Sequence, residues 1–454
     1  MYVSNEHAIM SVPVHVKDLA TKILPYRDQE RIRNQWLKKR LETVLPRVMK
    51  RSGIDVWVVC CKEYNEDPVL TTLVPCAMMT ARRTTMLVFH LQEDGTVRPM
   101  AITRPGVGLE GYYEAMWTNP KGYNWDESKS MMPDASSVEK KSQPETQWEC
   151  LNRVITDCNP KKIGINISDT FAFGDGLSHS LYTQMMDCFS EENKAKVVSA
   201  ERVCIGWLET RTEEELAAYN GIVQIAHAII DEAFSSRVVL PGVTTNADVK
   251  YFMMQMAYDL GINPWFDFEV SIRRAKVGEI AEETVILPGD MLHCDIGIRY
   301  LNICTDTQEN AYILKAGETD APEYLKEAMK RCNRLQDIVI GNFVEGRTGN
   351  EILAMSREQA IAEGIDPCIY THPIGYHGHG AGPTIGLWDM QGGVPVQGDY
   401  PLYNDTCYSL ELNCKAKIEE WGVEIAFGAE TDVMFTGDKV YYLAGRQDEF
   451  HLVK

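Results

Sequence analysis

Residues 290–307, DMLHCDIGIRYLNICTDT, decide the fold of the carboxyl-terminal half of the chain. Apolar residues at positions 292, 294 and 296 alternate with His293 and Asp295, which is the pattern of a strand with two distinct faces. A turn centred on Tyr300 and Leu301 would fold the segment into a hairpin. Positions 295 and 306 are symmetric about that centre, so we expect their side chains to lie opposite each other.

The two aspartates of this hairpin suggest a metal site. Facing carboxylates on Asp295 and Asp306 would lie roughly 5 Å apart and would repel each other. A bound dication removes that repulsion and can be bridged by both groups. The alternative is a pair of solvated aspartates on an exposed face of the hairpin.

Three further side chains have the right chemistry for metal binding. In residues 372–383, HPIGYHGHGAGP, glycines surround His379 and allow backbone or metal to approach it closely. Glu411 lies between two leucines, and Glu430 precedes an apolar run, each on a predicted strand. Each feature also has an ordinary explanation, a histidine in a turn or a glutamate facing water.

Taken together, these residues resemble the ligand set of the pita-bread metallopeptidases, which include methionine aminopeptidase, aminopeptidase P, prolidase and the metal-free relative creatinase. The resemblance implies that Asp295 binds one metal, that Asp306 and Glu430 bridge two, and that His379 and Glu411 complete the second site. It also makes Glu411 the general base. The set contains all five family ligand types in order, so we expect a metallated protein.

Such a ligand set consists mostly of hard donors. It suits two divalent ions, Mn first, with Co, Fe or Zn as alternatives. Two metals that share a hydroxide lower its pKa into the neutral range and can polarise a carbonyl. The resemblance therefore implies a hydrolase for a small peptide or another small molecule.

The sequence departs from the family pattern at two positions. The family's peptidases carry a second histidine seven residues after the ligand histidine, and counting from His379 that position is Gly386. They also carry a histidine about 17 residues before the first aspartate, where residues 273–279 contain none. These histidines normally contact the substrate carbonyl and the tetrahedral intermediate.

Other residues are candidates for the missing roles. His377 lies two residues before His379 and points the same way on an extended strand, so we take it as a catalytic candidate. The substrate-binding candidates are Arg273, His372 and His293, since an arginine can bind a carboxylate or an oxyanion. A structural histidine and a surface arginine are the ordinary alternatives. Trp388 either lines the pocket or packs in the core.

The first half of the chain predicts an α/β domain. It contains helix and strand patterns in alternation, and a long Gly/Pro-rich loop follows the second strand. The expected elements are a helix over 27–51, strands over 54–61 and 84–90, a loop over 104–147, a helix over 147–157 and a strand over 162–167. Residues 199–216, SAERVCIGWLETRTEEEL, resemble the junction to the family's first catalytic helix.

The second half begins with a helix signal and contains an internal echo. Thr212 precedes Glu215 by three residues, which is the spacing of a capping box. A second helix is expected over 246–260, and the segment that begins at Gly242 resembles the one that begins at Gly346. A helix–helix–strand unit used twice predicts a pseudo-twofold domain, although two weakly similar helices can also arise by chance.

We therefore predict a two-domain α/β protein. An amino-terminal α/β domain of the creatinase type would span residues 1–205, and a pseudo-twofold α+β pita-bread catalytic domain would span 206–454. Because it has this first domain, the chain resembles the aminopeptidase P, prolidase and creatinase branch of the family. That resemblance also implies a homodimer.

Composition limits the partners and the compartment. The formal charge of −20 argues against nucleic acid and anionic membranes, because phosphate binding needs basic patches. No apolar run is long enough to span a membrane. The 13 cysteines are scattered and include no CxxC pair, so we expect buried thiols and a reducing, cytoplasmic setting.

The leading functional hypothesis is a dinuclear-metal peptidase that cleaves short peptides of the Xaa-Pro type. A metal-dependent lyase or a non-peptide amide hydrolase on the same fold is the alternative, because of the two missing histidines. A non-catalytic binding protein that reuses the fold is the third possibility.

Overall fold

The computed structural model describes residues 2–3, 16–121 and 143–454 and divides them into two compact units. The amino-terminal unit comprises residues 26–212. The carboxyl-terminal unit comprises residues 213–454 together with the described part of residues 1–25. The boundary expected at residue 205 falls inside helix α8 (Glu201–Glu209). The first residues of the chain were expected in the other domain.

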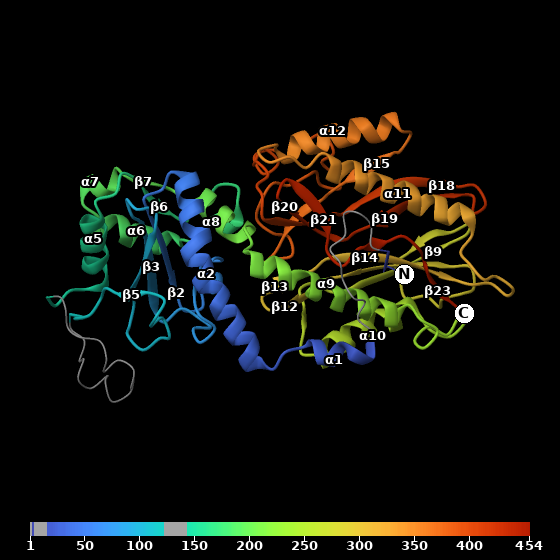
Figure 1. Ribbon diagram of the computed structural model, residues 1–454, viewed down its shortest axis with the longest axis horizontal. Coiled ribbons are helices and arrows are strands. Elements are labelled where there is room, and N and C mark those ends of the chain that lie inside the picture. The colour runs from blue at the N-terminus through green and yellow to red at the C-terminus, as the bar shows by residue number, and fades with distance from the viewer. Residues whose placement is uncertain (1, 4–15, 122–142) are drawn as a thin grey trace. The chain divides into compact units, whose positions relative to one another are not determined.

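The amino-terminal unit is built on a six-stranded sheet with the strand order β5-β4-β3-β2-β6-β7 (Figure 1). Strands β2, β3 and β4 are antiparallel, while β6 and β7 continue the sheet in parallel beside β2. The elements are α2 (Tyr26–Ser52), β2 (Val56–Lys62), α3 (Leu70–Leu73), β3 (Thr84–Leu91), β4 (Val97–Ile102), β5 (Glu114–Ala115), α5 (Gln147–Cys158), β6 (Ile163–Ile165), η3 (Ala172–Gly174), α6 (His179–Cys188), α7 (Glu191–Lys194), β7 (Val197–Ser199) and α8.

Strand β2 shows why this sheet is stable. Val56, Val58 and Cys60 pack on α5 and α6 in one apolar core. Trp57 and Val59 alternate with them on the opposite face and are equally buried. A strand covered on both faces reads as a continuous apolar run, which explains the sequence pattern.

The predicted helices and strands of this half are confirmed within a few residues. Helix α2 ends at Ser52, next to Gly53, as expected. The predicted loop over 104–147 contains the short strand β5, and residues 122–142 of that loop lie outside the described residues.

Within the described residues, the carboxyl-terminal unit contains four larger helices and five sheets. Its elements are β1 (Tyr2–Val3), η1 (Val16–Asp18), α1 (Leu19–Lys22), α9 (Glu213–Ala233), α10 (Asn246–Asp259), β8 (Asn263–Pro264), β9 (Glu269–Arg274), β10 (Gly278–Ile280), β11 (Met291–Ile296), β12 (Ile298–Tyr300), β13 (Ile303–Cys304), β14 (Thr307–Ile313), α11 (Glu323–Gly341), α12 (Gly349–Ala362), β15 (Pro367–Ile369), β16 (His372–Ile374), β17 (Thr406–Ser409), β18 (Leu412–Ile418), β19 (Val423–Ala429), β20 (Asp432–Thr436), β21 (Lys439–Tyr442), β22 (Arg446–Gln447) and β23 (His451–Val453). The largest sheets have the orders β10-β9-β11-β14-β23 and β16-β17-β20-β21.

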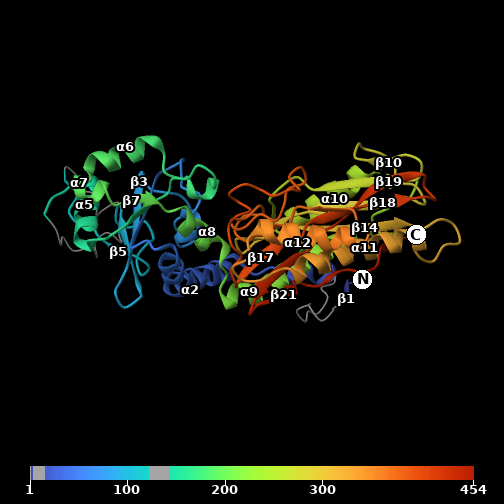
Figure 2. The ribbon, with the colours of Figure 1, turned by 90° about the horizontal axis from the view of Figure 1, so that it is seen from above.

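The internal echo corresponds to a repeated helix pair. Helices α9 and α10 contact β14 and β9, while α11 and α12 contact β18 and β15. Figure 1 shows the two pairs on opposite sides of the strands, and Figure 2 shows α11 and α12 from above. Thr245 caps α10 in a capping box with Asp248, and Thr348 caps α12 in the same way with Glu351. Because the same capping motif recurs at matching places, the echo is structural.

Helix α9 begins at Glu213, directly after Thr212, as the sequence predicts. The side chain of Glu215 is fully buried and accepts a hydrogen bond of 2.7 Å from the Tyr376 hydroxyl. This contact ties the first turn of α9 to the glycine-rich segment that contains His372 and His379.

The predicted register of the first hairpin is wrong by two residues. Asp295 pairs with Gln308, not with Asp306. The turn consists of Leu301 and Asn302, both at positive φ (51° and 68°), one residue later than expected. Two left-handed residues make a type I′ turn, whose twist matches that of the strands. Asp306 therefore lies just beyond the β11–β14 ladder.

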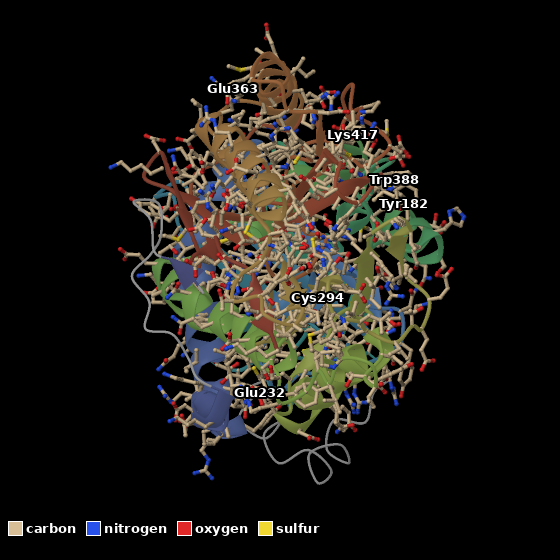
Figure 3. All side chains as sticks on the ribbon, turned by 90° about the vertical axis from the view of Figure 1, so that its right-hand side faces the viewer. Tyr182, Glu232, Cys294, Glu363, Trp388 and Lys417 are labelled. Atoms are coloured by element: carbon tan, nitrogen blue, oxygen red, sulfur yellow. The ribbon has the colours of Figure 1, made fainter. Side chains whose placement is uncertain are left out.

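All 13 cysteines are free thiols. Cys294, for example, is fully buried in β11, inside the unit, whereas Trp388 is 75% exposed at the surface (Figure 3). The alternative that Trp388 packs in the core is therefore wrong. Within the described ranges, every helix is too short or too polar to cross a membrane.

Candidate metal centre

Five acidic and imidazole side chains from five separate segments converge in the carboxyl-terminal unit. Asp306, His372 and Glu430 offer ligand atoms that all lie within 4.8 Å of one another, and Asp295, Glu411 and Glu430 form a second such group. Glu430 belongs to both groups, so the two are contiguous. The sheets explain the convergence, because Asp295 is the next-to-last residue of β11, Asp306 precedes β14, His372 begins β16, and the two glutamates lie at strand junctions.

The imidazole of this cluster is His372. Its Nε2 lies 3.5 Å from Asp306 Oδ2, 3.9 Å from Glu411 Oε2 and 3.8 Å from Glu430 Oε1. Its Nδ1 lies 3.0 Å from the carbonyl oxygen of Pro373, and a carbonyl can only accept a hydrogen bond. The proton therefore belongs on Nδ1. In the neutral ring the Nε2 lone pair then faces the three carboxylates, as metal ligation requires.

Burial makes the four carboxylates hard to ionise. Burial, and then the charge of Glu269, raise the pKa of Asp295 to about 7. Burial, and then the charge of Asp295, raise the pKa of Glu411 to about 8. The pKa values of Asp306 and Glu430 are raised well above their usual range, first by burial and then by neighbouring carboxylates. Mutually repelling acids in a dry site need a positive charge among them.

Several ligand atoms of this cluster have no hydrogen-bond partner. Asp295 Oδ1, Asp306 Oδ1, His372 Nε2 and Glu430 Oε2 are all buried and unpaired. An unpaired buried acceptor carries a desolvation penalty of about 1–3 kcal/mol, and more when it is charged. Divalent cations held by the two ligand groups would satisfy these atoms, and four carboxylates with one imidazole are mostly hard donors. The residues present therefore fit a divalent metal centre.

Neighbouring residues hold the ligands in place. The Gln308 side-chain amide donates to Glu411 Oε1 at 2.7 Å and to Asp295 Oδ2 at 3.4 Å. The hydroxyl of Ser409 donates to Glu430. The carboxylate of a further buried acid, Asp432, accepts the backbone N–H of Asp306 at 3.2 Å. These partners fix the carboxylates but leave the unpaired atoms free for a metal.

His379 lies beside the cluster rather than within it. Its ring meets the His372 ring edge to face, with the centroids 4.8 Å apart, and meets Trp265 in the same manner at 5.3 Å. Partial burial lowers the pKa of His379, which favours the neutral ring. A Cβ on Gly378 would come within 2.3 Å of the Trp265 ring, so the glycine before His379 is needed for this packing.

The structure thus differs from the prediction that His379 is the metal-binding histidine. His372 occupies that place, and His379 follows it by seven residues. That interval is the one expected between the ligand histidine and the second histidine. This interval is the sequence signal that favours His372 as the ligand histidine and His379 as the second histidine, which was expected at position 386.

Two other candidate histidines lie outside the metal groups. His293 is hydrogen-bonded through Nδ1 to the Asn310 side chain at 3.0 Å. Burial, and then the positive charge of Arg273, lower the pKa of His293 to about 3, so this ring is neutral. His377 is partly exposed, and its carbonyl oxygen accepts the N–H of Gly375 at 3.1 Å.

The two arginines of β9 differ completely. Arg274 pairs with Asp290 at 2.7 Å and supports a loop. Arg273 is only 4% exposed, and its Nε and Nη1 have no hydrogen-bond partner. Its Nη2 forms an ion pair with Glu279, whose carboxylate oxygen lies 3.6 Å away. A buried guanidinium with so little compensation is unusual, and the surface alternative for Arg273 is wrong.

Comparison with known proteins agrees with this geometry. Residues 218–434 match the model of metallopeptidase family M24. This stretch includes all five residues of the cluster, as well as His379. By this match and by its pita-bread fold, the chain resembles the metallopeptidases of family M24, and both findings support a metallopeptidase-type hydrolase.

Solved structures of peptidases are similar to this chain in fold. They include an X-Pro aminopeptidase from Thermotoga maritima (16% identity, TM-score 0.58, 90% of this chain and 100% of that one). A Xaa-Pro dipeptidase from Bacillus anthracis gives 16% identity and a TM-score of 0.56 over 92% of this chain and all of that one. A prolidase from Pyrococcus horikoshii gives 12% and 0.52 over 90% and 99%. At these identities the likeness concerns the fold, and it covers both units. No curated protein matches the sequence significantly.

Proposed function

We propose that the protein is a peptidase that binds two divalent metal ions, with Mn as the first choice and Co, Fe or Zn as alternatives, and that it hydrolyses short peptides of the Xaa-Pro type. The observation that supports this most directly is the pair of adjoining ligand groups with four buried, unpaired ligand atoms. The names of the similar structures supply the substrate class.

The two ligand groups suggest how the ions are shared. Asp306, His372 and Glu430 would hold one ion, and Asp295, Glu411 and Glu430 would hold the other. Glu430 would bridge the two, and the family resemblance adds Asp306 as a second bridge. Metal bound there would supply Lewis acidity and a water molecule acidified into the neutral range.

Glu411 is our candidate for the general base. Its Oε1 is held by the Gln308 amide, while Oε2 faces the interior of the cluster 3.9 Å from His372 Nε2. A carboxylate fixed at one oxygen can hold a proton at the other without changing position. Glu411 would take the proton of the attacking water and pass it to the leaving amine.

His379 is our candidate for the contact with the substrate carbonyl. His379 is exposed beside His372, and the edge-to-face contact with Trp265 orients its ring. A ring nitrogen that carries a proton can donate to the developing oxyanion. His377, two residues away, remains a candidate for the same task. Because His379 supplies one of the two histidines thought to be missing, the lyase and amide-hydrolase alternatives are not favoured.

Arg273 is our candidate for the substrate carboxylate. In the ladder between β9 and β11, Asp295 pairs with Glu269 and His293 pairs with Ser271. Arg273 follows Ser271 by two residues on β9, so its side chain lies on the same face of the sheet as Asp295 and His293. Its unpaired Nε and Nη1 are a ready fork for a carboxylate. His293, kept neutral beside it, would add a hydrogen bond.

Hydrolysis of dipeptides and tripeptides tests the proposal. Protein loaded with Mn should release the amino-terminal residue from Xaa-Pro substrates, and chelation should abolish this release. Glu411→Gln should lower kcat by about 10²-fold or more while metal stays bound, as is typical when a general base is removed. Arg273→Met should raise KM more than it lowers kcat. No turnover of any peptide with Mn, Co, Fe or Zn would contradict the proposal.

Two further expectations belong to this proposal. The family resemblance supports a homodimer, which light scattering on the purified protein would test. The 13 free thiols suit a reducing compartment, so we propose a cytoplasmic protein. Fractionation of cells would test that location.

A further inference from the structure

A cavity lies in the amino-terminal unit, between the start of β3, the end of β4 and the first turn of α5. It has a volume of about 230 Å³. Eight residues line it, three of them arginines: Arg82, Arg83, Thr84, Arg104, Pro105, Trp117, Pro120 and Gln147. Three arginines around one cavity are unexpected in a chain with a formal charge of −20.

Among the described residues, the Glu63 carboxylate contacts Arg82 and Arg83, and it accepts the backbone N–H of Arg83 at 3.4 Å. Glu63 lies 3.7 Å from Arg82, which is too long for a hydrogen bond, and both groups are partly exposed. Glu145 is already engaged by Arg153, through bonds of 2.7 Å and 3.0 Å. In the part of the chain that the structure describes, Arg83 has no carboxylate partner for its guanidinium.

The cavity walls are fixed by hydrogen bonds of Gln147 and Trp117. The Gln147 amide donates to the carbonyl oxygens of Thr84 and Ile102, at 2.8 Å and 2.7 Å, and so joins α5 to β3 and β4. The indole N–H of Trp117 donates to the carbonyl oxygen of Glu145 at 2.9 Å. These bonds fix the wall to which β3, β4 and α5 contribute, while the three arginines complete the lining.

Arg83 has a backbone conformation that favours glycine. Its φ is +55°, in the left-handed region, where a side chain costs roughly 1–2 kcal/mol. Its carbonyl oxygen accepts the N–H of Glu63 at 2.7 Å, which fixes that conformation. Glycine would adopt this conformation without strain. The presence of an arginine is therefore consistent with a role for its side chain.

We propose that this cavity binds a small organic anion, a phosphate or carboxylate attached to a flat apolar group. The guanidinium groups of Arg82 and Arg83 match the geometry of either anion. The indole of Trp117 and the two proline rings offer apolar surface on which a flat group can stack. The site lies within the amino-terminal unit, so it is separate from the metal centre and independent of the proposed peptidase activity.

Calorimetric titration of the Mn-loaded protein with phenyl phosphate and with benzoate tests this inference. Inorganic phosphate and benzyl alcohol separate the anionic contribution from the apolar one, and both should bind more weakly than the joined compounds. Arg82→Glu should weaken binding of the better probe by about tenfold or more, because a hydrogen bond to a charged group contributes about 1.5–3 kcal/mol.

Arg83→Gly separates a binding role from a structural one. Glycine suits the left-handed backbone, so the melting temperature should not fall, yet binding should weaken by about tenfold. Arg27→Glu, an exposed charge reversal on α2 of the same unit, is the matched control and should bind as the wild type does. The proposal is overturned if neither probe binds, or if Arg82→Glu and Arg83→Gly bind like the control. It is also overturned if these variants change the oligomeric state instead, which would make the cavity an interface between copies.

Discussion

Removing metal should make the stability of the protein fall steeply with pH, because the ligand carboxylates are buried next to one another. The pKa of Asp295 is raised from 3.8 to about 7, and that of Glu411 from 4.5 to about 8. In the unfolded chain both groups ionise near pH 4. Between pH 5 and 8 the folded, metal-free protein therefore binds more protons than the unfolded chain. The contribution of these groups to stability is therefore full at low pH and falls as the pH rises. It is lost once the pH has passed the folded pKa values of about 7 and about 8.

The size of the effect follows from these shifts. One unit of pKa shift corresponds to about 1.4 kcal/mol. The parts of the two pKa shifts that fall between pH 5 and 8 add up to several units. The two groups also repel each other, so we expect a total loss of roughly 5 kcal/mol rather than the full sum. For a unit of this size, 1 kcal/mol shifts the melting temperature by about 2–4 °C. The metal-free protein should therefore melt about 10 °C lower at pH 8 than at pH 5.

Thermal unfolding followed by circular dichroism is the assay. Chelated protein should show the fall, and saturating Mn should remove most of it, because bound metal replaces the protons. Glu411→Gln cannot ionise at that position, so its metal-free form should lose less stability over the same pH range. A melting temperature that stays constant from pH 5 to 8 without metal, or that ignores added Mn, would refute this reasoning.

Two substitutions outside the ligand set test the packing that supports the site. Gly378→Ala would force a Cβ into the Trp265 ring and should lower kcat, with a loss of about 1–3 kcal/mol in unfolding free energy, measured by urea titration; an unchanged kcat would contradict the role given to this contact. Thr348→Ala removes the cap shared with Glu351 and should cost about 1 kcal/mol while peptide turnover stays normal, whereas loss of turnover would mean that the second helix pair shapes the site directly.

Much of the fold could be predicted from sequence because its signals are local. A helix that begins directly after Thr212 and two capped helices after Gly242 and Gly346 depend on residues within one or two turns of each other. Apolar alternation in β2 and β11 likewise needs only a few neighbours. Elements of this kind form wherever the local pattern occurs, so their positions were correct within a few residues.

The errors arose where the structure depends on choices that the local pattern leaves open. Leu301 has a left-handed backbone, which a leucine seldom adopts, so the turn could not be placed to the residue. The two histidines are a similar case. Both His372 and His379 have glycines nearby, and only the fold shows which imidazole reaches Asp306. Their separation of seven residues was the available signal.

The buried, unpaired atoms could not be predicted at all. Arg273 Nε and His372 Nε2 become notable only when burial and hydrogen bonding are known together. The arginine-rich cavity is similar, since Arg82, Arg104 and Trp117 meet through pairing of β3 with β4 and docking of α5. The segment that supplies Arg104 and Trp117 was predicted only as part of a loop over 104–147.

Metal stoichiometry of two histidine variants tests the central claim most directly. After loading with Mn and removal of free metal, elemental analysis should find about two ions per chain in the wild type and in His379→Ala. His372→Ala should retain about one ion or fewer, because its Nε2 is the imidazole that faces Asp306 and Glu430. Two ions in His372→Ala together with a loss in His379→Ala, or no Mn in the wild type, would contradict the account.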